Sequence, residues 1–248
     1  MKELLKDKVA FLTGGNGGIG LACGRIMAEQ GARVILADIV TDKAQALADE
    51  IKERGGMAEV IRFDVTDFKN IKKHIDRALG FFGRIDILVN IAGITGSTPI
   101  DEISLESWDR MMDIDLKSTF FITQEVFRHM KEQMGGKIVF VSSLAALRGG
   151  RSSDCSYAAA KAAEVNLGKS FALSGAAYNI CSNTICPGNV VTPMGKTLSW
   201  YSKDPKSYIP LGHFGSCEDV AYGVLFYSSK MSDYITGDVM NISGGLYM

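Results

Sequence analysis

Tyr157 and Lys161 are the pair of side chains in this sequence best suited to chemistry. A spacing of four residues places both side chains on one face of a helix. A cationic lysine beside a phenol favours the phenolate and lowers its pKa from an ordinary value of about 10 toward the working pH. The pair is therefore suited to general acid–base catalysis on a hydroxyl or carbonyl group. By itself, however, a Y-x-x-x-K pattern is common by chance and usually marks a surface pair.

A glycine-rich turn is the second candidate feature. Gly14, Gly18 and Gly20 have the spacing G-x-x-x-G-x-G, with Asn16 and Ile19 between them. Small residues let the backbone approach a pyrophosphate closely, and the N-terminus of a following helix supplies free N–H groups and a favourable dipole. A glycine loop alone is a weak indicator. Its position between a predicted strand and a predicted helix favours a nucleotide site.

Asp38 ends the next predicted strand, about 20 residues past the glycine turn, where an acidic side chain meets a ribose 2′-hydroxyl. A carboxylate there would repel the 2′-phosphate of NADP. Gly17 offers no cation for that phosphate, and Arg33 lies at the other end of the strand. We therefore expect NAD as the cofactor. The alternative is that Asp38 is a solvated turn residue.

Two further segments follow predicted strands and fit the same cofactor. Asp64 and Val65 follow the third strand, where Asp64 could accept a hydrogen bond from the adenine amino group. Asn90, Ala92 and Gly93 follow the fourth strand. The small residues of this segment would let the backbone pass close to the adenosine ribose. Each segment alone is more often a turn than a site.

Short β-branched runs alternate with longer helical patterns, which predicts the elements that position these residues. Strands are expected at 8–13, 33–38, 59–63, 85–89, 137–142, 180–185 and 239–242, and helices at 18–30, 41–54, 67–82, 104–134, 155–177 and 218–229. Such alternation implies a parallel sheet covered on both faces. The predicted fold class is α/β, a single-domain, Rossmann-like doubly wound parallel sheet of about seven strands with helices on both faces. Thr41 is the expected N-cap of its helix.

We expect residues 1–248 to form one dinucleotide-binding and catalytic domain, because no internal repeat, low-complexity segment or linker is present. An irregular stretch at about 188–215, here named the substrate loop, contains three prolines and several aromatic residues. It could close over the substrate as a lid. Packing between subunits is the alternative role, in particular for Trp200.

The composition restricts the class of protein. Hydrophobic residues make up 46% and charged residues 22% of the 248 residues, as in ordinary globular proteins, and the net charge of −1 does not indicate binding to nucleic acid or to an anionic membrane surface. Five cysteines without a C-x-x-C motif and three scattered histidines do not predict a metal site. The charged stretch 1–8 is unlike a signal peptide, and no apolar run approaches the ~20 residues that span a bilayer. We expect a cytoplasmic protein with reduced thiols.

Taken in order along the chain, the motifs resemble those of the short-chain dehydrogenase/reductase family. They are Thr13-Gly-x-x-x-Gly-x-Gly20, Asn90-x-Ala-Gly93, Ser143, Tyr157-x-x-x-Lys161 and Pro187-Gly188. The resemblance runs from about residue 6 to the C-terminus. The occurrence of all these motifs together, in this order, is very specific. It implies an NAD-dependent enzyme acting on a secondary alcohol or ketone. It also implies a homotetramer or dimer that pairs through the helices at 104–134 and 155–177.

The resemblance implies roles for individual residues. Tyr157 would be the general acid/base, Lys161 would lower its pKa and bind the nicotinamide ribose, and Ser143 would polarise the substrate carbonyl or alkoxide. Ser142 is a second candidate for the hydroxyl role. The remaining cofactor contacts would come from Gly14, Asn16, Gly18, Ile19, Gly20, Asp38, Asp64, Val65, Asn90, Ala92, Gly93, Pro187, Gly188, Val190 and Thr192.

Asp115 occupies the position where the family carries its fourth catalytic residue, an asparagine that orients a water linking the lysine to solvent. An ionised aspartate accepts hydrogen bonds but cannot donate them. It could still hold that water, and its charge would raise the pKa of Lys161. Two interpretations follow: an active enzyme with an altered proton relay, or a damaged enzyme.

Three functions are compatible with the sequence. The first is NAD-dependent oxidation of a secondary alcohol, with a polyol, sugar or hydroxysteroid as substrate. The second is reduction of a 3-oxoacyl thioester on an acyl carrier protein, against which Asp38 and the lack of a basic patch argue. The third, a non-catalytic nucleotide-binding protein, is suggested by Asp115 alone.

Overall fold

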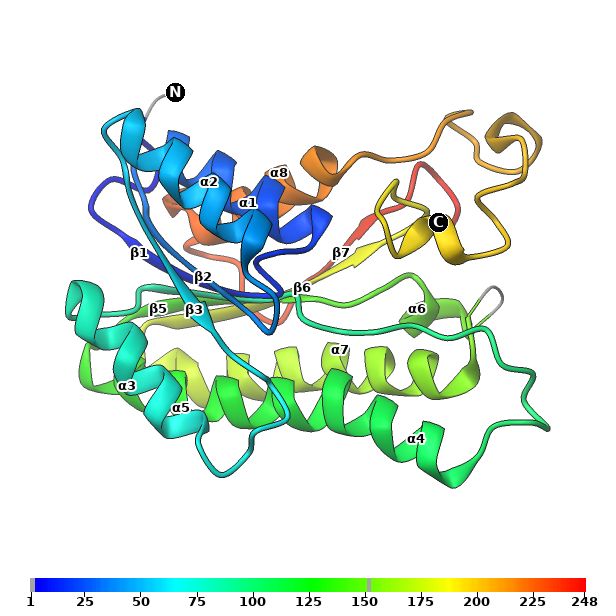
Figure 1. The fold of residues 1–248 in the computed structure, drawn as a ribbon, viewed down its shortest axis with the longest axis horizontal. Helices are drawn as coiled ribbons and strands as arrows, with labels where there is room; N and C mark the ends of the chain where they lie inside the picture. The colour runs from blue at the N-terminus through cyan, green and yellow to red at the C-terminus, as the bar shows by residue number, and fades with distance from the viewer. Residues whose placement is uncertain (1–2, 151–152) are drawn as a thin grey trace.

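The computed structural model describes residues 3–150 and 153–248, which form a seven-stranded sheet between two layers of helices (Figure 1). The strand order is β3-β2-β1-β4-β5-β6-β7, and every neighbouring pair is parallel. The strands are β1 (Val9–Thr13), β2 (Arg33–Asp38), β3 (Met57–Arg62), β4 (Ile87–Asn90), β5 (Gly136–Val141), β6 (Ile180–Pro187) and β7 (Val239–Ile242). The predicted doubly wound fold is confirmed.

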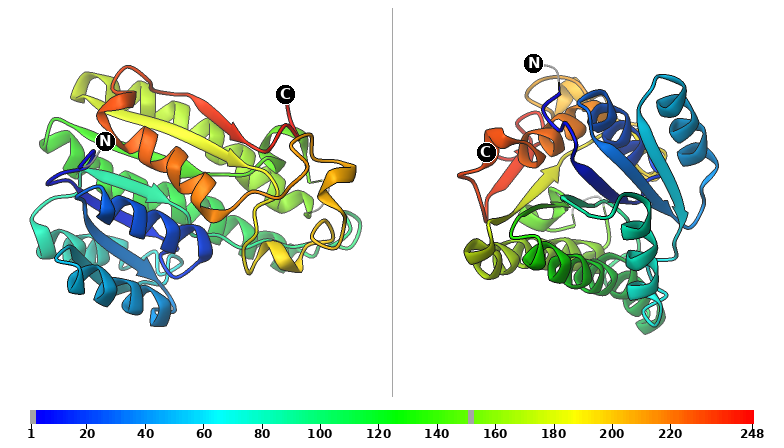
Figure 2. Two further views of the ribbon diagram at one scale, coloured as in Figure 1. Left: turned by 90° about the horizontal axis from the view of Figure 1, so that it is seen from above. Right: turned by 90° about the vertical axis from the view of Figure 1, so that its left-hand side faces the viewer.

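Helices cover both faces of this sheet, as Figures 1 and 2 show. One layer holds α1 (Gly18–Glu29), α2 (Asp42–Glu53) and α8 (Cys217–Ser228); the other holds α3 (Ile71–Phe82), α4 (Leu105–Met111), α5 (Ser118–Glu132) and α7 (Cys155–Gly175). A short helix, α6 (Ala145–Arg148), follows β5. No helix of the described residues is both long and apolar enough to cross a membrane.

The sheet supplies two separate cores because successive side chains of a strand point to opposite faces. In β1, Ala10 and Leu12 belong to the core beneath α1, α2 and α8. Val9 and Phe11 belong to the core on the α3, α5 and α7 side. All four are fully buried, which explains why the strand is a continuous apolar run rather than an alternating one.

The predicted helix at 104–134 is interrupted. A π-helical stretch, Met112–Lys117, separates α4 from α5. Such stretches are rare and frequently lie at functional sites. Asp115 lies within this one and is fully buried.

The N-terminus of α2 is capped from a distance. Thr41 occupies the N-cap position, as predicted, but its side chain makes no capping hydrogen bond. The Asn16 side chain in the glycine turn accepts instead from the main-chain N–H groups of Lys43 and Ala44, each at 2.8 Å. This contact fixes α2 against the turn.

The substrate loop projects beyond the carboxyl ends of the strands (Figure 2). It contains two short 3₁₀ helices, Gly195–Thr197 and Pro205–Ser207, and a bridge between Val190 and Gly215 joins its ends. Trp200 is buried and packs against Tyr201 and Phe214 of the same region. Aromatic residues of the loop region therefore pack against one another and form its local core.

Candidate active site

The site lies at the carboxyl ends of the strands, where ligands bind in open α/β sheets. Ser143 follows β5 and lines the same pocket as Tyr157, and its hydroxyl lowers the pKa of the phenol. The main-chain N–H of Ala145 donates to the Ser143 hydroxyl oxygen at 3.1 Å and fixes its position. The hydroxyl of Ser142 is occupied elsewhere, since it donates to the main-chain carbonyl of Lys161 at 2.7 Å. Ser143 is thus the hydroxyl that faces the tyrosine.

Tyr157 is held in the first turn of α7. Asp154 caps this helix, and its Oδ1 accepts from the Tyr157 N–H at 2.9 Å. Lys161 follows one turn later, with its Nζ 5.9 Å from the centre of the Tyr157 ring. Helical spacing therefore brings the two side chains to one face, as the sequence indicated.

Lys161 lies between two carboxylates. Its Nζ is 3.4 Å from Asp115 Oδ2 and 2.9 Å from Glu164 Oε1, and all three side chains are at most 4% exposed. Asp115 is oriented by the main-chain N–H of Ile94, which donates to its Oδ1 at 2.8 Å. Sequence reasoning missed Glu164, although its i, i+3 spacing from Lys161 was a usable signal.

Burial and charge act in opposite directions on these groups. Burial alone lowers the pKa of Lys161, but the carboxylates of Glu164 and Asp115 outweigh it and raise that pKa. Burial raises the pKa of Tyr157, while Lys161 and the Ser143 hydroxyl lower it. Lys161 therefore acts on the phenol in the expected direction but does not offset burial. The positive charge of an oxidised nicotinamide beside the phenol would add to the lowering.

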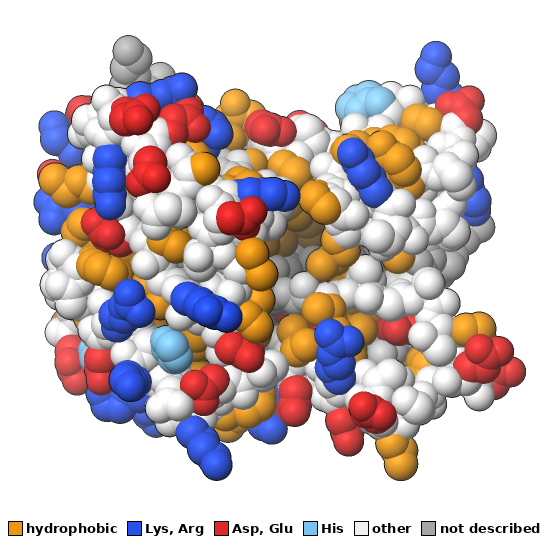
Figure 3. Space-filling model, in the orientation of Figure 1, with side chains coloured by type: hydrophobic (Ala, Val, Ile, Leu, Met, Phe, Trp, Pro, Cys, Tyr) orange, Lys and Arg blue, Asp and Glu red, His pale blue; other side chains and the backbone are white. Residues whose placement is uncertain are grey.

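A long cleft runs from the glycine turn to Tyr157 and Lys161. Its lining includes most of the predicted cofactor residues: Gly14, Gly18, Ile19, Gly20, Asp38, Asp64, Val65, Ala92, Gly93 and Thr192. Figure 3 shows a hollow, bordered largely by hydrophobic side chains, in the middle of the face that it presents.

The glycine turn fits a dinucleotide. A Cβ at Gly14 would lie 2.8 Å from the Ala92 nitrogen, and a Cβ at Gly20 would lie 2.1 Å from the Gly14 oxygen. Larger residues would therefore disrupt the turn. No side chain of the described residues caps α1, so its first N–H groups stay available for a pyrophosphate.

Five predicted cofactor residues do not line this cleft. Pro187, Gly188 and Val190 line a neighbouring pocket, and Asn16 and Asn90 line neither cavity. The Asn16 side chain caps α2, as described above, and its Nδ2 donates to Asp42 at 3.0 Å. Asn90 is buried and donates from Nδ2 to the Thr123 hydroxyl at 2.9 Å. Both side chains support the elements around the site.

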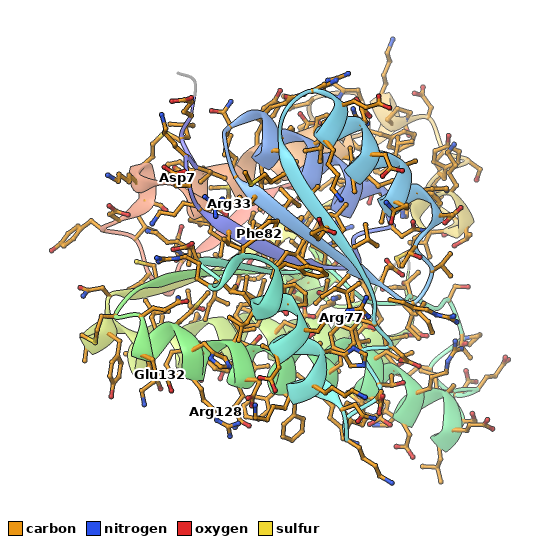
Figure 4. The ribbon with its side chains drawn as sticks, turned by 60° about the vertical axis from the view of Figure 1, so that its left-hand side comes forward. Asp7, Arg33, Arg77, Phe82, Arg128 and Glu132 are labelled. Atoms are coloured by element: carbon orange, nitrogen blue, oxygen red, sulfur yellow. The ribbon has the colours of Figure 1, made fainter. Side chains whose placement is uncertain are left out.

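Arg33 lies at the far end of β2 from Asp38. Figure 4 shows it between Asp7 and Phe82; its guanidinium is 3.8 Å from the Asp7 carboxylate and 6.0 Å from the centre of the Phe82 ring. It therefore cannot contact a phosphate at the Asp38 end.

A second pocket adjoins the cleft and shares Tyr157 with it. Ser143, Leu144, Leu198 and Trp200 line this pocket, as do the predicted nicotinamide residues Pro187, Gly188, Val190 and Thr192. A cofactor in the cleft and a small molecule in the pocket would therefore meet at the tyrosine.

The fold and this site define a nucleotide-dependent oxidoreductase. A sequence model described as short chain dehydrogenase matches residues 8–201, and the chain belongs to that family. It is therefore an enzyme that acts on CH–OH groups of a small-molecule substrate, with the nicotinamide cofactor of the family.

Known relatives span nearly the whole chain. A 3-oxoacyl-[acyl-carrier-protein] reductase of Thermotoga maritima is 38% identical over 98% of both chains. An L-rhamnose 1-dehydrogenase (NAD(P)(+)) of Azotobacter vinelandii is 36% identical over 99% of this chain and 98% of its own. The crystal structure of levodione reductase superposes with a TM-score of 0.91 at 29% identity, covering 97% of this chain and 98% of that one. These relatives differ in their named substrates.

Proposed function

We propose that this protein interconverts a secondary alcohol and a ketone with NAD(H). The observation that carries the proposal is the position of Tyr157, which lies where the cofactor cleft and the second pocket meet. A bound nicotinamide would accept or supply the hydride. Purified protein mixed with NAD and a panel of secondary alcohols tests the proposal through the appearance of NADH.

The catalytic roles follow from the geometry. Ser143 would donate a hydrogen bond to a substrate oxygen held within reach of Tyr157, since both residues line the second pocket. During oxidation the Tyr157 phenolate takes the alcohol proton, and during reduction the phenol returns it. Lys161 stabilises the phenolate, and Asp115 and Glu164 keep the ammonium charged and oriented.

Asp38 supports NAD as the cofactor. Its carboxylate is held at the cleft by the main-chain N–H groups of Asn16 at 3.0 Å and Val40 at 3.3 Å. A fixed anion at this position accepts from a ribose hydroxyl and repels a 2′-phosphate. The next residues, Ile39 and Val40, supply no compensating cation.

Replacing Asp38 with asparagine is expected to raise the ratio of kcat/KM for NADP to that for NAD about tenfold or more, because one like-charge repulsion of at least ~1.4 kcal/mol disappears. Asp42→Asn is the matched control: it removes a carboxylate that contacts Asn16 but does not line the cleft. An unchanged preference in Asp38→Asn would remove the basis for assigning NAD.

The second pocket supports a compact substrate. Leu144, Leu198 and the buried ring of Trp200 line it, and Ser143 presents a hydroxyl beside Tyr157. A cyclic alcohol, polyol or sugar is the compact substrate class that we propose, in keeping with the relative named for L-rhamnose, and a hydroxysteroid would be its bulkiest member. Reduction of a 3-oxoacyl thioester is the second candidate, favoured by the relative from Thermotoga maritima.

We propose that the substrate loop determines substrate size through Trp200. Trp200→Ala is expected to lower kcat/KM for a small cyclic alcohol about tenfold, because the lost contact is worth roughly 1–3 kcal/mol in a hydrophobic pocket. The same change should raise relative activity on bulkier alcohols. Steady-state kinetics on paired small and large substrates check this, and an equal loss on both would assign Trp200 to loop folding alone.

We also propose that the protein assembles as a homotetramer or dimer. The layer of α4, α5 and α7 carries exposed large apolar side chains at Leu105, Phe121 and Leu173. Their exposure on the helices through which the family pairs supports the proposal. Light scattering on wild type and Phe121→Asp tests the proposal. The cytoplasmic location stays a prediction from the sequence.

A further inference from the structure

Glu164 is a buried ionisable group that the roles above use only as a neighbour of Lys161. It lies one turn after Lys161 on α7 and is 2% exposed. Its Oε1 accepts from Lys161 Nζ at 2.9 Å. Its Oε2 is buried, and no hydrogen bond reaches it from the described residues. Half of this carboxylate is therefore left without a donor, which favours a proton on it.

The charges around Glu164 do not balance when both carboxylates are ionised. Asp115 from the π-helical stretch and Glu164 from α7 share one ammonium, so the cluster carries one net negative charge in the interior. The other titratable groups acting with Glu164 are Tyr157 on α7 and the Cys186 thiol on β6, and neither supplies positive charge. A proton on one carboxylate would neutralise the cluster.

Each carboxylate has one buried oxygen without a hydrogen bond from the described residues, Asp115 Oδ2 and Glu164 Oε2, and burial raises the pKa of both groups. Glu164 is the better placed of the two to exchange a proton with Lys161, because its Oε1 lies 2.9 Å from Nζ, against 3.4 Å for Asp115 Oδ2. Asp115 Oδ1 already accepts from the Ile94 N–H at 2.8 Å, a bond that favours the ionised form. The Thr119 hydroxyl donates to the main-chain carbonyl of Asp115 at 2.9 Å, and its effect on Glu164 is to lower the pKa of that carboxyl, against the effect of burial. Burial raises the pKa of Glu164 to about 8, although Lys161 opposes this.

We propose that Glu164 is a positioning residue that stores a proton beside Lys161 and releases it when the oxidised cofactor binds. The inference rests on the proposed function, because it requires a nicotinamide in the cleft that Lys161 and Asp115 line. The positive ring of the oxidised cofactor replaces the proton as the counter-charge of the two carboxylates. The neutral ring of the reduced cofactor does not.

The same exchange accounts for the proton produced by alcohol oxidation. The hydrogen of the alcohol C–H bond would leave with the bonding electron pair, as hydride, to a bound nicotinamide, and the O–H proton would pass to the Tyr157 phenolate as the C=O bond forms. Lys161 then passes a proton to Glu164 Oε1 along their 2.9 Å hydrogen bond, and its own proton is replaced from Tyr157. The phenolate is regenerated, and the proton rests on Glu164 when the positive charge of the cofactor has gone.

Calorimetric titration of the protein with NAD⁺ and with NADH at pH 7, in two buffers of different ionisation heat, counts the protons released. Wild type should release about one proton with NAD⁺ and close to none with NADH. Glu164→Gln should release close to none with either. Glu125→Gln, a change of a buried glutamate on α5 that pairs with Arg128, should behave as wild type. Because binding releases a proton, the Kd of wild type for NAD⁺ should fall about tenfold for each unit by which the pH rises toward neutrality.

Unfolding by urea gives a readout that needs no cofactor. The pKa of Glu164 is raised from 4.5 to about 8, so between these pH values the folded state holds a proton that the unfolded state has lost. The free energy of unfolding of wild type should therefore fall, relative to that of Glu164→Gln, as the pH rises from 4.5 to about 8. A constant difference between the two proteins would overturn the proposal.

The calorimetric outcomes separate the two claims. NAD⁺ binding without proton release in wild type, or equal release in Glu164→Gln, would overturn the role of Glu164 and leave the proposed function standing. Failure to bind either form of the cofactor would overturn the proposed function and the coupling with it.

Discussion

Tyr157→Phe is expected to lower kcat for alcohol oxidation about 10²- to 10⁴-fold, the range that positioned acid–base groups contribute. The change removes one hydroxyl, which lies in the same pocket as Ser143, and leaves the ring in place at the junction of cleft and pocket. The Kd for NAD should change little, because the glycine turn and Asp38 are untouched. Steady-state kinetics and calorimetric titration with NAD measure the two quantities.

Tyr178→Phe is the matched control for this variant. Tyr178 lies in the 3₁₀ turn that follows α7 and stacks on Lys131, away from the cleft. It should keep the activity of wild type. Residual activity of Tyr157→Phe above about a tenth of wild type would mean that another group moves the proton.

Lys161→Met is expected to lower the free energy of unfolding by about 3–5 kcal/mol near pH 8, besides abolishing turnover. The side chain is 4% exposed and lies between two carboxylates that are themselves at most 2% exposed. Its removal leaves these groups buried without a counter-charge. Urea unfolding followed by circular dichroism gives the difference directly.

Two controls show whether charge is the cause of this loss. The double variant Lys161→Met with Glu164→Gln should recover part of the lost stability, since one uncompensated carboxylate is then neutral. The loss in Lys161→Met should also shrink as the pH falls, because protonation neutralises the remaining carboxyls and the folded state gains those protons. A loss that is equal at pH 5 and pH 8 would assign the effect to packing.

The fold was predictable from the sequence because its signals are local. Apolar runs such as 8–13 and 33–38 alternate with helical patterns, and the structure has β1 and β2 at these places. The spacing of Tyr157 and Lys161 and the glycines after β1 were likewise visible. All of these depend on residues within a few positions of one another.

The remaining features depend on contacts between distant segments. The burial of Glu164 arises only when α7 packs against the π-helical stretch that holds Asp115. That stretch lies inside an ordinary helical pattern, and hydrophobic periodicity does not reveal it. Thr41 occupies the predicted N-cap position of α2, but the capping hydrogen bonds come from Asn16, 27 positions before Lys43, and no local pattern reveals such a contact.

The surroundings of Asp115 do not favour a non-catalytic nucleotide-binding protein, the third function that was compatible with the sequence. An aspartate at this position keeps Lys161 charged and leaves Tyr157 and Ser143 facing each other. Asp115 is therefore compatible with an altered proton relay in an active enzyme, which is what family membership indicates.

The most direct test of the central claim is a substrate panel assayed with both NAD(H) and NADP(H). The panel contains cyclic alcohols, polyols, sugars, hydroxysteroids and 3-oxoacyl thioesters, and each active compound is repeated with Tyr157→Phe. We predict NAD-dependent oxidation of a compact secondary alcohol, with a higher kcat/KM for NAD than for NADP and with loss of turnover in the variant. NADPH-driven reduction of a 3-oxoacyl thioester as the fastest reaction, or turnover that survives Tyr157→Phe, would contradict the account.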